Sequence, residues 1–114
     1  MSKRLSVKDA RLIKKHFYIL KTLSKVNKSR RLRILEKAPN TLFKVLDIVF
    51  KHCISGAIPI DVKNVKLCKS FVKAGSKKST GGIKAKVIQD GGSFPLLLAG
   101  LVPIIGDLLS KLIK

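Results

Sequence analysis

No residue between Gly91 and Gly106 carries a charge, although the 114-residue chain as a whole has a net charge of +19. This stretch is shorter than the about 20 apolar residues that a membrane-spanning helix needs, and Pro103 interrupts it. Its side chains therefore need another apolar environment, which the chain itself, a partner protein or a membrane surface can provide. Because 114 residues correspond to one ordinary domain, this feature divides a small molecule into a cationic body and an apolar tail.

The tail is predicted to hold two helical segments. From Ile104 onward, apolar residues recur at the spacing of one helical face, with Asp107 and Lys111 on the other, which predicts an amphipathic helix of about three turns. The apolar segment before it is bracketed by Pro95 and Pro103, so a separate short helix is expected there. The tail either contacts a partner or membrane, or forms a hairpin that completes the core of the same chain. The residues expected to make these contacts are Phe94, Leu97, Leu98, Leu101, Ile104, Ile105, Leu108, Leu109 and Leu112.

Positive charge is concentrated in the first part of the chain. Thirteen of the 25 Lys and Arg residues precede Pro39, where the acidic residues are Asp9 and Glu36. An isolated charge run is usually a solvated surface, but an excess this one-sided repels itself unless a polyanion neutralises it. Double-stranded DNA, with one phosphate charge per roughly 1.7 Å of axis, is the expected partner, and anionic lipid is the second candidate. The residues expected to bind nucleic acid are Lys14, Lys15, Lys21, Lys28, Arg30, Arg31, Arg33, Lys77, Lys78, Lys84 and Lys86.

Two further observations bear on the partner and the compartment. The sequence Arg30-Arg31-Leu32-Arg33 is typical of a nuclear localisation signal, which is compatible with DNA binding. With five Phe, one Tyr and no Trp, the composition weakens any interpretation based on stacking against single-stranded bases. The charged start of the chain has no apolar segment after it, so we expect the protein in the cytosol, the nucleus or a particle assembled there.

Four helices are predicted in the body, because apolar residues at helical spacing are preceded by capping residues and followed by Gly or Pro. The third has the highest apolar density and is expected to be central. Short connections favour an all-α fold, a small antiparallel bundle of three to four helices. The expected helices run from a cap at Ser6 or Asp9 to about Lys25, from Ser29 to Ala38 before Pro39, from a cap at Asn40 to about Cys53, and from a cap at Asp61 to Gly75.

The residues after this bundle differ in composition. The segment Ser76–Gly82 is rich in Lys, Ser and Gly, which predicts a flexible basic linker. The segment Ile83–Gln89 alternates apolar and polar residues like a short strand, which we expect to be disordered when free or to pair with another molecule. The chain is thus divided into a basic helical bundle (1–75), a basic flexible linker (76–90) and a hydrophobic C-terminal tail (91–114).

Catalysis and metal binding find no support in the sequence. The six acidic residues are spread along the chain, and neither His16 nor His52 has a Ser or Cys with an orienting carboxylate at a recognisable spacing. Cys53 and Cys68 are expected to be plain buried thiols, with a disulfide or a metal site as the alternatives. We therefore expect a protein that is not an enzyme and has no catalytic residue, cofactor, metal or small-molecule substrate.

Several segments carry a resemblance to a viral protein family. In the tail, Gly91-Gly92-Ser93-Phe94-Pro95-Leu96-Leu97-Leu98 and Val102-Pro103-Ile104-Ile105-Gly106 resemble the hydrophobic C-terminal domain of the adenovirus late core protein X precursor. The layout of the whole chain resembles the adenovirus-X-like proteins encoded by adintoviruses and by Polinton (Maverick) DNA transposons. The segments that match them more loosely are Leu20–Lys25, Gly56–Ile60 and Gln89–Gly92.

The resemblance implies a virion core protein that condenses double-stranded DNA and occurs in the virion and the host nucleus. It also implies processing at Gly91 and Gly92 by the adenovirus-type cysteine protease, although Gln89 stands where that protease prefers an aliphatic residue. The Arg-rich tracts of the adenoviral protein are missing from this chain. Here the positive charge falls on predicted helices instead.

Two functional hypotheses follow. In the first, the body neutralises DNA phosphates without reading bases, while the tail docks on a capsid protein, on a second copy or on an anionic membrane. In the second, the amphipathic tail is the active part, and the protein is a lytic or entry factor that perturbs membranes.

Overall fold

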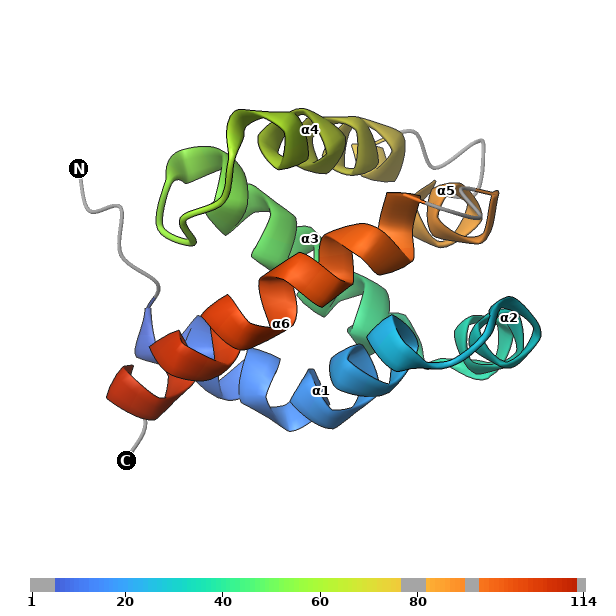
Figure 1. Cartoon of the computed structure of the whole chain (residues 1–114), viewed down its shortest axis with the longest axis horizontal. Helices are drawn as coiled ribbons and strands as arrows, with labels where there is room; N and C mark the ends of the chain where they lie inside the picture. Colours follow the sequence, from blue (N-terminus) through green and yellow to red (C-terminus); the bar gives the residue numbers. More distant parts are fainter. Residues whose placement is uncertain (1–5, 77–81, 90–92, 113–114) are drawn as a thin grey trace.

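The computed structural model describes residues 6–76, 82–89 and 93–112, and all regular structure in this part of the chain is helical (Figure 1). The prediction of an all-α fold is therefore confirmed. In Figure 1, α6 crosses the front of the molecule, with α4 along one edge and α1 along the opposite edge. The helices are α1 (Val7–Lys25), α2 (Lys28–Lys37), α3 (Asn40–Ser55), α4 (Val62–Ser76), α5 (Gly82–Gln89) and α6 (Ser93–Leu112).

The ends of the first four helices follow local capping chemistry. Ser6 Oγ accepts a hydrogen bond from the Asp9 N–H at 3.1 Å, and Asp61 Oδ1 accepts one from the Asn64 N–H at 2.9 Å, so both predicted caps are confirmed. Gly56, with φ at 91°, ends α3 in the left-handed region that glycine adopts most easily.

Two predicted helix starts are wrong by one residue. α2 begins at Lys28 rather than Ser29, because the Asn27 side chain accepts a hydrogen bond from the Arg30 N–H at 2.9 Å. α3 begins at Asn40 itself, with Pro39 in the capping position and no side-chain hydrogen bond there. These are small shifts in boundary, and the four helices that the periodicity predicts are all present.

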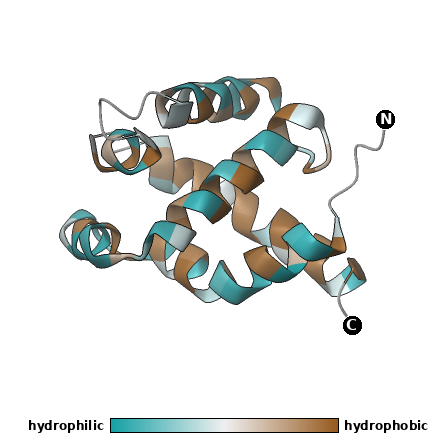
Figure 2. Cartoon of the chain, turned by 180° about the vertical axis from the view of Figure 1, so that it is seen from behind, coloured by the Kyte–Doolittle hydropathy of each residue, from teal (hydrophilic) through white to brown (hydrophobic). Residues whose placement is uncertain are grey.

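The core is built around α3, as its apolar density predicts. Three aromatic rings link it to its neighbours: Phe50 of α3 stacks on Phe71 of α4 at 5.1 Å between centroids, and Phe71 meets Phe94 of α6 edge-on at 5.8 Å. In Figure 2, the helices seen from behind carry hydrophilic and hydrophobic residues side by side, as amphipathic helices around one core do. The buried residues of α3 are Leu42, Phe43, Val45, Leu46, Val49, Phe50 and Cys53.

The C-terminal tail is part of this core, so a tail held apart from the body is not what the structure shows. It is a single helix that continues through Pro103, and the predicted break there is wrong. Pro103 removes one hydrogen bond to the Ala99 carbonyl, but both residues are exposed, so water can reach that carbonyl. Of the two predicted arrangements of the tail, the one that completes the core of the same chain agrees better with the structure. The tail does so as the single helix α6 and not as a hairpin. The residues of α6 buried in the protein are Phe94, Leu97, Leu98, Leu101, Ile105 and Leu109.

The predicted strand at Ile83–Gln89 is wrong, because these residues lie in helix α5. Ile83 and Val87 are one helical turn apart and are both buried, mainly against α4. A Cβ atom on Gly75 would lie 2.7 Å from Ile83 Cγ1, so the absence of a side chain at Gly75 allows this approach. The predicted linker therefore contains a packed helix, whereas residues 77–81 and 90–92 lie outside the described part of the chain.

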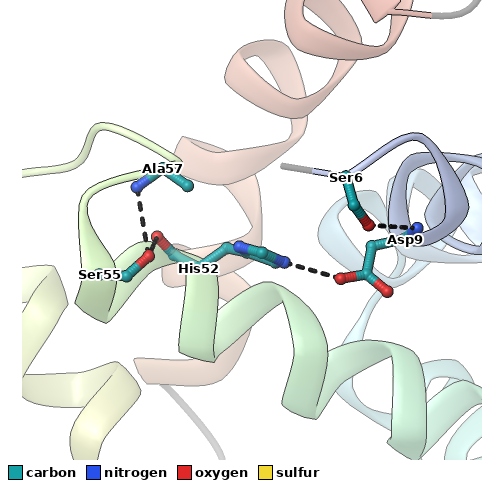
Figure 3. Close-up of polar contacts among 5 residues, drawn as sticks. All are labelled: Ser6, Asp9, His52, Ser55 and Ala57. Carbon is teal, nitrogen blue, oxygen red and sulfur yellow. Dashed lines mark hydrogen bonds and ion pairs between the residues drawn. The ribbon is translucent and has the colours of Figure 1, made fainter. Parts of the chain in front are cut away.

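Polar contacts also join α1 to α3 at the end of the bundle shown in Figure 3. His52 Nε2 lies 3.0 Å from Asp9 Oδ2, across 43 positions of sequence. Ser55 Oγ donates to the His52 carbonyl at 3.1 Å and accepts from the Ala57 N–H at 3.4 Å, which holds the chain as it leaves α3.

Candidate nucleic-acid interface

The outer face of α1 is a continuous cationic surface. Ala10, Ile13, Leu20 and Leu23 are buried on its inner face. The exposed residues on the other side recur every three or four positions, so they form a stripe about 21 Å long at 1.5 Å per residue. We call this surface the α1 stripe, and it consists of Arg11, Lys14, Lys15, Tyr18, Lys21 and Lys25.

A hollow of about 530 Å³ lies within the α1 stripe. Lys21 Nζ is 5.9 Å from the centroid of the Phe17 ring, and Thr22 Oγ1 donates to the Tyr18 carbonyl at 3.0 Å. Tyr18 is 74% exposed and was not among the residues expected from the sequence. Its spacing from Lys14 and Lys21 could have revealed it, since all three fall on one helical face. The residues that line this hollow are Lys14, Phe17, Tyr18, Lys21, Thr22 and Lys25.

A second concave surface, of about 710 Å³, lies between α1, α2 and the start of α3. Arg30, Arg33 and Lys37 line it and fall on one face of α2, at positions i, i+3 and i+7. Its apolar part includes Ile19 and Ile34. No acidic residue is among its described lining residues or in the first turn of α2, so the positive end of the helix dipole adds to the local field.

Six of the residues expected to bind nucleic acid are exposed on these two helices. They are Lys14, Lys15, Lys21, Lys28, Arg30 and Arg33. α2 follows α1 after only two residues, Val26 and Asn27, so the exposed cations of the two helices belong to one region of the chain. Lys77 and Lys78 lie outside the described residues.

Two of the expected residues have other contacts in the structure, and a third is not fully exposed. Arg31 is only 8% exposed, and its Nη1 donates to the Val26 carbonyl at 3.3 Å, so it holds the α1–α2 turn instead of facing solvent. Lys84 Nζ donates to the Glu36 carbonyl at 3.2 Å and lies 5.7 Å from the centroid of the Phe43 ring, which ties α5 to α2. Lys86 is half-buried.

Four of the five acidic residues of the described chain are engaged away from the α1 stripe or at its end, and the fifth, Glu36, is exposed on α2, three positions from Arg33. Asp47 pairs with Lys51 at 2.9 Å, and Asp107 pairs with Lys111 at 3.1 Å, each within one helix. Asp9 contacts His52, and the side chain of Asp61 caps α4. Within the described residues, Lys14, Lys15, Lys21, Arg30 and Arg33 therefore have no carboxylate partner, and their charge remains available for an external anion.

The tail residues expected to contact a partner are divided between core and surface. Six are buried, Ile104 and Leu108 are half-buried, and Leu112 is exposed. The surface that α6 presents before Asp107 is uncharged and includes Leu96, which is 76% exposed. We call it the outer face of α6, and it consists of Leu96, Ala99, Gly100 and Pro103.

Among the described helices, α6 is the one that is long and apolar enough to cross a membrane by length and composition, with a mean hydropathy of 1.8. One third of that window, 33%, is buried inside the protein. The core helix of a soluble protein can have the same length and composition, so this property alone does not distinguish a membrane helix from a core helix.

The described cysteine and histidine residues form structural contacts. Cys53 and Cys68 are free and buried, as expected for plain thiols. A hydrogen bond with Cys68, together with burial, raises the pKa of the Cys53 thiol. His16 contacts the Leu12 carbonyl at 3.1 Å and Thr41 Oγ1 at 3.3 Å. Within the described residues, no group of three or more His, Cys, Asp and Glu side chains is arranged to hold a metal ion.

Comparison with known proteins identified no relative of this chain. No protein-family model matches it, and neither the curated proteins nor the solved structures give a significant match.

Proposed function

We propose that this protein binds and condenses double-stranded DNA without sequence preference. The observation that carries the proposal is the α1 stripe, which together with the exposed cations of α2 forms a cationic surface without a carboxylate partner among the described residues. Duplex DNA carries one negative charge per roughly 1.7 Å of axis, so a stripe about 21 Å long spans several phosphates. Contacts to phosphates fix the position of a protein on DNA but carry no sequence information directly.

Condensation requires that one molecule contact more than one duplex, and α4 supports this requirement. Lys63, Lys66, Lys69 and Lys73 of α4 are exposed. In Figure 1, α4 and α1 lie along opposite edges of the molecule, with α3 and α6 between them. Two cationic helices on opposite edges can bind two duplexes at once, and they neutralise the repulsion between those duplexes.

The test of DNA binding is the dependence of affinity on salt. With about six to eight phosphate contacts, affinity for a duplex falls roughly 10³- to 10⁴-fold between 50 and 200 mM salt and hardly varies with sequence. The triple variant Lys14→Gln, Lys21→Gln and Lys25→Gln lowers the slope of log affinity against log salt by about 0.9 for each phosphate that it no longer binds. The control is Lys51→Gln, because Asp47 already pairs with Lys51. A flat salt response, or strong preference for one sequence, would contradict the proposal.

Light scattering separates condensation from binding. Replacing Lys63, Lys66, Lys69 and Lys73 by Gln leaves one cationic face intact, so the variant still binds a short duplex but no longer condenses long DNA. The triple variant of Lys14, Lys21 and Lys25 is expected to bind the short duplex more weakly and also to condense long DNA less. If the α4 variant condenses DNA as well as the native protein does, bridging through α4 is wrong.

The resemblance to adenovirus-X-like proteins supports a virion core as the setting of this activity and the host nucleus as the place of assembly. In that setting, the outer face of α6 is the surface proposed to dock on a capsid protein, on a second copy or on an anionic membrane. Leu96 is the large apolar side chain that this face offers. Gly91 and Gly92, where the resemblance implies processing, lie outside the described residues.

Membrane activity is the second candidate, and the length and hydropathy of α6 favour it. In the folded protein, six apolar residues of α6 are buried, so membrane insertion requires α6 to leave the bundle. Leakage of anionic vesicles by the full-length protein, reduced in the Leu112→Asp variant, would support this function. Leu112 is suitable because it is exposed and its replacement leaves the core unchanged. Intact vesicles in the presence of excess protein would exclude it.

A further inference from the structure

We infer that the α1 stripe is also a binding site for single-stranded nucleic acid, in which Tyr18 stacks on a base while Lys14, Lys21 and Lys25 hold the neighbouring phosphates. The inference rests on the proposed function, because the same lysines bind the phosphates of a duplex. The inference adds a second class of ligand, single strands, in which the faces of the bases are accessible. Tyr18 is the residue that distinguishes single strands from duplexes.

The first observation is the position of the ring. Tyr18 is 74% exposed, whereas Phe43, Phe50, Phe71 and Phe94 are buried in the core. Phe17, the remaining Phe, is half-buried beneath the same hollow. A single exposed apolar residue is common on protein surfaces and has no meaning by itself. The location of Tyr18 within a row of cations is what makes it informative.

The second observation is the arrangement of cations around the ring. Lys14 precedes Tyr18 by one turn, Lys21 follows it by one turn, and Lys25 follows by two. These residues line the hollow of about 530 Å³ together with Tyr18. A cationic surface that follows a strand, with an aromatic platform inside it, is the arrangement by which proteins bind single strands without sequence preference.

Double-stranded DNA makes no use of this ring. In a duplex each base is covered on both faces by its neighbours, so a side chain on the outside of a helix meets sugars and phosphates. In a single strand, every base can offer its face to an aromatic side chain. The lysines therefore contribute to both kinds of ligand, and Tyr18 contributes to single strands alone.

The chain offers a direct spectroscopic test, because Tyr18 is its one tyrosine and it has no tryptophan. Intrinsic tyrosine emission of the full-length protein thus reports on Tyr18 without a label. Oligothymidylate is expected to quench this emission strongly, and a duplex of equal length at the same salt concentration is expected to quench it weakly. Affinities for both ligands are measured in parallel for Tyr18→Leu, Tyr18→Phe and the control Val62→Ala, which alters an exposed apolar residue of α4.

Tyr18→Leu is expected to lower the affinity for oligothymidylate about tenfold and to leave the affinity for the duplex within about twofold. Tyr18→Phe and Val62→Ala leave both affinities nearly unchanged, because the first keeps the ring and the second lies outside the α1 stripe. Equal loss for both ligands in Tyr18→Leu, or no loss for either, would overturn the inference while leaving DNA binding intact. Absence of binding to either ligand by the native protein would instead overturn the proposed function itself.

Discussion

Gly106 of α6 and Phe17 of α1 approach each other so closely that a Cβ atom on the glycine would lie 3.3 Å from Phe17 Cζ. This contact joins the apolar C-terminal helix to the helix that carries the α1 stripe. Phe17 also lines the hollow beside Tyr18, so the same side chain contributes to both the core and the candidate binding surface. The position of α6 therefore bears on the surface proposed to bind nucleic acid.

Gly106→Leu is expected to destabilise the protein by about 1–3 kcal/mol, because a large side chain at this position must displace Phe17 or separate the two helices. Gly100→Ala, six positions earlier in the same helix, is the matched control. No atom lies within 4 Å of the Cβ that it adds, so the variant gains about 0.4–1 kcal/mol from the higher helix propensity of alanine. Urea unfolding followed by circular dichroism measures both. A neutral effect of Gly106→Leu would show that α6 does not pack on α1 in solution.

Two neighbouring leucines of α6 give a second test of this packing. Leu97 is 1% exposed and Leu96 is 76% exposed, although the sequence presents them as equivalent apolar residues. Leu97→Ala is expected to cost about 2–5 kcal/mol of unfolding free energy, since it leaves a cavity among α6 and its neighbours. Leu96→Ala is expected to change this free energy by less than about 0.5 kcal/mol. Similar effects of the two substitutions would contradict the orientation of α6.

Local rules explain how much of the fold could be predicted. The first four helices were predictable because their apolar spacing, their caps at Ser6 and Asp61 and the glycine at Gly56 all point to one structure. The continuity of α6 was not, because the helix-breaking tendency of Pro103 is a local preference that tertiary packing overrides. The residues of α5 predict a strand because their apolar positions fit a period of two as well as one helical turn.

The candidate site was predictable to a similar extent. Exposed lysines on an amphipathic helix follow from the periodicity that places apolar residues on the opposite face. The roles of Arg31 and Lys84 depend on backbone carbonyls, and for Lys84 that carbonyl is 48 positions away, so no local pattern reveals it. A count of aromatic residues over the whole chain does not single out Tyr18, because its significance lies in its neighbours.

The contact between His52 and Asp9 predicts that Asp9 contributes more to the free energy of unfolding than Asp47 does. Asp9 joins α1 to α3 and also stands in the first turn of α1, where a negative charge favours the helix dipole. Asp9→Asn is therefore expected to cost about 1 kcal/mol of unfolding free energy. Asp47→Asn disrupts a pair within one helix whose lysine is 62% exposed, so it is expected to cost less than about 0.5 kcal/mol. Thermal unfolding at neutral pH measures both, and equal losses would show that the α1–α3 contact adds nothing.

Arg31 and Arg33 lie two positions apart in α2, yet the first is buried and the second is exposed. Arg31 is buried and donates to the Val26 carbonyl, so Arg31→Ala is expected to cost about 1–3 kcal/mol of stability by removing packing and a hydrogen bond. Arg33 is exposed and lines the concave surface of about 710 Å³ between α1, α2 and the start of α3. Arg33→Ala is therefore expected to change the free energy of unfolding by less than about 0.5 kcal/mol.

DNA binding is expected to reverse the order of these two variants. Arg33→Ala lowers the slope of log affinity against log salt by about 0.9, the value for one phosphate contact, whereas Arg31→Ala leaves the slope of the folded protein unchanged. The two quantities are measured on the same samples, stability by urea unfolding and affinity by titration at several salt concentrations. Should Arg31→Ala lower the salt slope as much as Arg33→Ala does without loss of stability, its side chain must leave the α1–α2 turn to bind phosphate, and the separation of structural from binding arginines in α2 would be wrong.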